Sequence, residues 1–75
     1  MKLAYRNYDV EIKTIFYTRQ SNDLTPVVEI AADGSLKLLL TTQFFPTAKQ
    51  AEQYGVKMAR KWIRQYDGKR NISHN

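Results

Sequence analysis

The sequence predicts an α+β domain in which one C-terminal amphipathic helix packs on a three-stranded antiparallel sheet. Apolar residues alternate with polar ones at residues 8–13, further strand-forming apolar runs extend to about residue 45, and from residue 48 apolar residues recur every three or four positions. The first period is typical of strands and the second of helices, so a β-β-β-α order indicates a two-layer domain. A chain of 75 residues holds one such domain. We expect it to span residues 1–68, followed by a flexible basic tail at 69–75.

The first strand is expected between residues 3 and 19. Tyr8, Val10 and Ile12 alternate with charged residues, which indicates a strand with one buried face. A polar run at residues 20–23 indicates a loop after it.

The second and third strands are expected to form a hairpin. Residues 27–31 follow Pro26, which can begin a strand but not occupy its middle. An Asp-Gly pair at 33–34 tolerates the positive φ angles that a tight hairpin turn needs. The third strand is expected over residues 36–45, and the first strand is expected to pair antiparallel with one of these two.

The helix is expected over residues 48–66. Thr47 is its predicted N-cap, because a hydroxyl accepts a hydrogen bond from a free amide of the first turn. Gly68 is predicted to lie just past its end. Gly55 costs about 1 kcal/mol relative to Ala inside a helix. Its place in the apolar stripe therefore predicts a close approach of helix to sheet.

One face of the sheet is expected to meet the apolar stripe of the helix, because alternate residues of a strand share a face. The expected core consists of Val10, Ile12, Val28, Ile30, Leu36, Leu38 and Leu40 from the sheet and Ala51, Gly55, Met58 and Trp62 from the helix.

The opposite sheet face is the first candidate binding surface. A single helix covers only one face, and an uncovered apolar patch is typical of an interface. A small core without disulfides, in a chain with 0 Cys, also gains stability by self-association. The alternative is that the N-terminal segment or the loop before the second strand covers this face. The interface candidates are Ile15, Tyr17, Val27, Leu39 and Phe45.

The outer side of the helix is the second candidate surface. The net charge of +5 favours acidic partners, and cations cluster on the helix side opposite the apolar stripe. This clustering predicts docking of phosphates or of an acidic protein, and an ordinary solvated helix face is the alternative. Trp62 and Tyr66 are expected to point to the core, which argues against stacking of single-stranded nucleic acid there. The candidates are Lys49, Lys57, Arg60, Lys61 and Arg64.

Catalytic groups are scarce in the sequence. The only histidine is His74, close to the C-terminus, and there is no Gly-rich phosphate loop. Glu11 and Glu29 resemble a pair of catalytic carboxylates, but Lys13 and Lys37 are expected on the same sheet face, which favours cross-strand ion pairs. We therefore predict a protein that is not an enzyme and that binds no cofactor, metal or small-molecule substrate.

Three resemblances accompany these patterns. The opening M-K-L-A-Y-R at 1–6 resembles that of short uncharacterised cyanobacterial proteins. The segment F-P-T-A-K-Q-A-E at 45–52 resembles the strand-to-helix junction of HlyU-type small bacterial proteins, which have a three-stranded sheet followed by a helix. The β-β-β-α order is similar to the DNA-binding fold of integrase N-terminal domains, which implies Arg and aromatic readers on the exposed sheet face. The residues expected there are instead Glu11, Lys13, Glu29 and Lys37.

The sequence as a whole predicts a small binding or regulatory module, acting as a protein-interaction adaptor. Its expected partner is an acidic protein or a second copy in a homodimer. The alternative is a nucleic-acid-associated regulatory protein, able to bind DNA through the basic helix side and tail. Charged residues interrupt any apolar stretch near the N-terminus, and no apolar run reaches the length of a membrane span. We therefore expect a cytoplasmic location without membrane contact.

Overall fold

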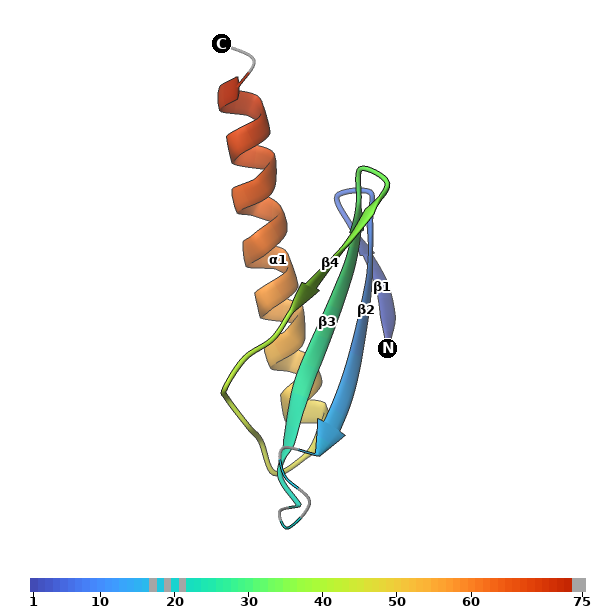
Figure 1. Ribbon diagram of the computed structural model, residues 1–75, viewed down its shortest axis with the longest axis vertical. Helices are drawn as coiled ribbons and strands as arrows, with labels where there is room; N and C mark the ends of the chain where they lie inside the picture. The colour runs from blue at the N-terminus through green and yellow to red at the C-terminus, as the bar shows by residue number, and fades with distance from the viewer. Residues whose placement is uncertain (17, 19, 21, 74–75) are drawn as a thin grey trace.

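The computed structural model describes residues 1–16, 18, 20 and 22–73, the last four as backbone only. A four-stranded antiparallel sheet carries one long helix across one face (Figure 1). The α+β class and the sheet-then-helix order are confirmed, but the sheet has four strands rather than three. The elements are β1 (Lys2–Tyr5), β2 (Tyr8–Phe16), β3 (Leu24–Ala32), β4 (Ser35–Leu39) and α1 (Ala48–Ser73), and the strands lie in sequence order across the sheet.

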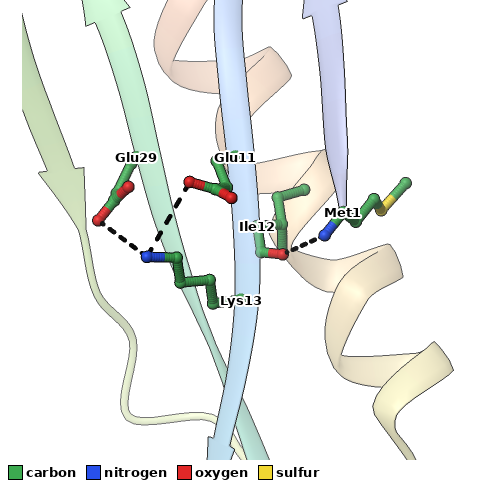
Figure 2. Close-up of polar contacts among 5 residues, drawn as sticks. All are labelled: Met1, Glu11, Ile12, Lys13 and Glu29. Carbon is green, nitrogen blue, oxygen red and sulfur yellow. Dashed lines mark hydrogen bonds and ion pairs between the residues drawn. The ribbon is translucent and has the colours of Figure 1, made fainter.

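The additional strand, β1, arises from a tight turn at Arg6 and Asn7. Both residues have positive φ, 52° and 69°, and Tyr5 pairs with Tyr8 across the turn. Two successive positive φ angles are the mark of the type I′ turn that joins antiparallel strands. The Met1 amino group extends this pairing by donating to the Ile12 carbonyl at 3.0 Å (Figure 2).

The hairpin predicted at residues 33–34 is confirmed. Asp33 and Gly34 have φ of 52° and 78°, and Ala32 pairs with Ser35. The antiparallel pairing of β2 with β3 is also confirmed. The third predicted strand is shorter than expected, because β4 ends at Leu39.

Pro26 lies inside β3, contrary to the prediction that it would only begin a strand. The backbone of Leu24 exchanges two hydrogen bonds of 2.7 Å with Phe45, on the side away from β2. Because alternate residues of a strand direct their N–H and C=O to the same side, the Pro26 nitrogen also points away from β2. β4 ends at Leu39, opposite Val28, so the missing N–H of Pro26 lies just past the end of the ladder.

The helix begins where the sequence predicts and ends later. The Thr47 hydroxyl accepts a hydrogen bond from the Gln50 N–H at 3.2 Å, which confirms the N-cap. α1 continues to Ser73, so the prediction that it ends before Gly68 is wrong. Residues 74–75 lie outside the described residues, and a loose tail there stays a prediction.

The core lies between α1 and the two central strands. The predicted core positions on β2 and β3 are confirmed, since Val10, Ile12, Val28 and Ile30 are at most 2% exposed. On the helix the most buried residues are Ala51, Gly55, Ala59 and Ile63, whereas Met58 and Trp62 pack only partly against the core.

The predicted face of the third strand is wrong. Ile30 pairs with Lys37 and Val28 pairs with Leu39, so Lys37 and Leu39 lie on the helix side of β4. Leu36 and Leu38 alternate with them and face away from the helix. Within the part of the chain that is described, no helix combines the length and apolar character needed to cross a membrane.

Candidate binding surfaces

The sheet face turned away from α1, here called the open face, carries an unusual set of leucines. Leu36 and Leu38 are 66% and 52% exposed, and Leu40 follows at the same spacing with 67% exposed. We call these three residues the leucine row. An edge strand with several large apolar side chains in water is the type of patch that marks an interaction surface.

The predicted interface candidates divide between the two faces. Ile15, 51% exposed, and the half-buried Val27 lie on the open face. Leu39 instead packs against the core, and the Phe45 ring lies 5.2 Å from the Tyr54 ring of α1, so their placement on the open face is wrong. Tyr17 lies outside the described residues.

Charged side chains occupy the middle of the open face (Figure 2). The Lys13 ammonium lies 3.8 Å from a Glu29 carboxylate oxygen and 4.0 Å from one of Glu11. A cross-strand ion pair is therefore confirmed between Lys13 and Glu29, whereas the Glu11 contact lies within β2 and Lys37 lies on the other face. Pairs this exposed contribute at most about 1 kcal/mol each.

A broad hollow of about 470 Å³ lies over the same face. Its lining combines three carboxylates with one lysine and with apolar groups, so phosphates would be repelled. The open face is thus better suited to protein than to nucleic acid. The lining residues are Lys2, Leu3, Asp9, Val10, Glu11, Glu29, Ala31 and Leu36.

The outer side of α1 is basic, as the sequence predicts. All five candidates, Lys49, Lys57, Arg60, Lys61 and Arg64, are exposed, and we call this set the basic face. The Arg60 guanidinium lies 5.7 Å from the centre of the Tyr5 ring, so this side chain leans toward β1.

The acidic residues of α1 leave the basic face largely uncompensated. Glu52 is half-buried. Asp67 accepts a hydrogen bond from the Tyr8 hydroxyl at 2.9 Å and lies 3.6 Å from Arg6. The Asp67 carboxylate therefore connects the β1–β2 turn to the helix and does not compensate the basic face.

A third surface, which the sequence did not predict, lies where α1 passes β4. Trp62 stacks on Tyr66 with ring centroids 4.8 Å apart and an interplanar angle of 14°. A hollow of about 210 Å³ beside this pair is lined by Lys37, Trp62, Gln65, Tyr66 and Lys69, and we call it the Trp62 hollow. Sequence reasoning missed it because Lys37 was assigned to the opposite sheet face and both rings to the core.

Comparison with known proteins finds no matching family model and no significantly similar curated protein or solved structure. The resemblances to HlyU-type and cyanobacterial proteins therefore remain predictions, and function has to be argued from the surfaces themselves.

Proposed function

We propose that this chain is a non-enzymatic binding module that self-associates through its open face. The observation that supports this most strongly is the leucine row, whose side chains are 52–67% exposed, with Leu36 and Leu38 on one face of β4 and Leu40 directly after the strand. Burying a leucine fully stabilises a protein by about 1.5–3 kcal/mol, so a partner that covers three of them gains substantially. A cytoplasmic location for this module stays a prediction.

A second copy of the chain is the partner that this face fits best. A twofold axis near Leu38 places the leucine row of one copy against that of the other, and such a contact is complementary to itself. The carboxylate nearest the row is Glu29, which pairs with Leu38 across the strands and is already compensated by Lys13. The remaining charges lie on β1 and β2, at the rim of such a contact.

Sedimentation velocity with a matched pair of variants tests this proposal. Wild type is expected to sediment as a dimer at micromolar concentration, and Leu38→Lys is expected to be monomeric. Phe16→Lys is the control and should leave the dimer unchanged, because Phe16 is 65% exposed but follows Ile15 in β2 and therefore lies on the other face of the sheet. A wild type that is monomeric at millimolar concentration, or an unchanged dimer in Leu38→Lys, contradicts the proposal.

Nucleic-acid binding by the basic face is the second candidate function. It is supported by the exposure of Lys57, Arg60, Lys61 and Arg64 on the side of α1 opposite its buried residues. Phosphate contacts make binding steeply dependent on salt, whereas an apolar interface depends on it weakly. Reversal of these four cations to Glu should abolish duplex binding and leave the fold intact, and unchanged binding would exclude this face.

A further inference from the structure

The Trp62 hollow has a rigid aromatic floor. Tyr66, on which Trp62 stacks, donates a hydrogen bond from its hydroxyl to Asp33 in the β3–β4 turn. The Tyr8 ring meets Tyr66 edge-on, at 6.0 Å and 80°. With contacts from the turn, from β2 and from α1, the Tyr66 ring is held in place, and the indole resting on it is positioned as well.

The charged residues that line this floor are both lysines. Lys37 approaches from β4 and Lys69 from α1, two turns beyond Trp62, and both are exposed. Among the described residues, the lining contains two ammonium groups, the amide of Gln65 and no carboxylate. The Asp33 carboxylate accepts a hydrogen bond from the Tyr66 hydroxyl and keeps its negative charge, but it is not part of the lining.

We infer that the Trp62 hollow binds a nucleotide unit, with the base against the Trp62–Tyr66 pair and the phosphate between Lys37 and Lys69. An aromatic surface binds a base by stacking whatever its identity, and lysines bind phosphate as point charges. The Gln65 amide offers a donor and an acceptor to the edge of the base. This inference does not depend on self-association, because the hollow lies on the helix side of β4.

The size of the hollow restricts the ligand. At about 210 Å³ it is smaller than the roughly 300–1,000 Å³ of pockets for drug-sized molecules. It therefore suits a single base, from a free nucleotide or from one unit of a single strand, and excludes the paired bases of a duplex.

Trp62 is the only tryptophan, so its fluorescence reports directly on the site. Titrations with AMP, with an eight-residue oligoadenylate and with inorganic phosphate distinguish the sources. Saturable quenching by AMP or by the oligonucleotide supports the inference, and tighter binding of the oligonucleotide assigns the ligand to a strand. Quenching by phosphate as strong as that by AMP, or unchanged emission with both nucleotides, overturns it.

Two double variants separate this hollow from the general positive charge. Lys37→Gln with Lys69→Gln removes both ammonium groups of the hollow, and Lys57→Gln with Lys61→Gln makes the same charge change on the basic face. Binding is measured by the anisotropy of a labelled oligoadenylate. The first pair of substitutions should weaken binding about tenfold or more and the second less than about threefold, because direct phosphate contacts are lost only in the first pair. Equal losses in the two pairs contradict the assignment, and melting curves show whether both variants remain folded.

Discussion

Gly55 and Gly68 offer the same substitution in one helix with different expected results. A Cβ added at Gly55 would lie 2.8 Å from Ile12 Cγ2 and 3.3 Å from Pro26 Cβ, both in the buried sheet. Carbon atoms normally approach to about 3.5–4.0 Å, so the helix or β2 must move by about 0.7 Å. A Cβ at Gly68 meets nothing within 4 Å.

The difference between the two variants isolates the packing term. Replacing Gly by Ala inside a helix gains about 1 kcal/mol at either position, and this gain cancels in the comparison. Overpacking at Gly55 costs about 1–3 kcal/mol. Gly68→Ala should therefore be more stable than wild type, and Gly55→Ala less stable than Gly68→Ala by about 1–3 kcal/mol.

Urea and thermal unfolding, followed by circular dichroism and Trp62 fluorescence, measure this difference. For a domain of this size each kcal/mol corresponds to about 4–8 °C in Tm. Equal stabilisation by both substitutions would refute the close approach of α1 to the sheet at Gly55. A loss of stability in Gly68→Ala would instead refute the continuation of the helix through that residue.

Three further substitutions test other parts of the fold. Ile63→Ala should lower the free energy of unfolding by about 2–5 kcal/mol, enough to unfold much of a domain this small, whereas Ile63→Val should lower it by about 0.5–1.5 kcal/mol. A folded, stable Ile63→Ala protein would contradict the central position of Ile63 in the core. Asn7→Ala should lower the free energy of unfolding in urea by about 1–2 kcal/mol, because position 7 has a positive φ that alanine adopts only with strain. Asn7→Gly should not lower it, because glycine adopts positive φ readily. Asp67→Ala should lower the free energy of unfolding by about 0.5–1.5 kcal/mol through loss of the Tyr8 hydrogen bond. Asp67→Asn should lower it less, because the amide oxygen can still accept that bond, and equal losses in both variants would assign the effect to charge alone.

The two hairpins show which local signals can be read from a sequence. Asp33-Gly34 is a common type I′ pair, and its turn was predicted correctly. The Arg6-Asn7 turn was missed because arginine seldom adopts positive φ. Its Arg6 is paired with Asp67 at the far end of the chain, 3.6 Å away, and this long-range contact cannot be recognised before the fold is known.

The end of the helix has a similar explanation. A glycine near the end of an apolar stripe usually terminates a helix, and Gly68 was interpreted in that way. Asp67 is instead held by Tyr8 and Arg6, so the turn that contains Gly68 stays helical and α1 continues to Ser73. Tertiary contacts thus outweigh the local preference of one residue.

The face that each residue of β4 presents explains both the leucine row and the Trp62 hollow. Apolar alternation alone favours Leu36 and Leu38 in the core, but the two-residue turn pairs Ala32 with Ser35 and Ile30 with Lys37. Because a shift of one residue exchanges the faces of a whole strand, the turn sends the leucines outward and brings Lys37 toward Trp62. The fold forgoes the burial of these leucines in its own core. A partner that covers the open face restores that burial, and this is the physical reason to seek a second copy there. The same register places Lys37 beside Trp62, and this is the reason to seek an anionic ligand on the helix side.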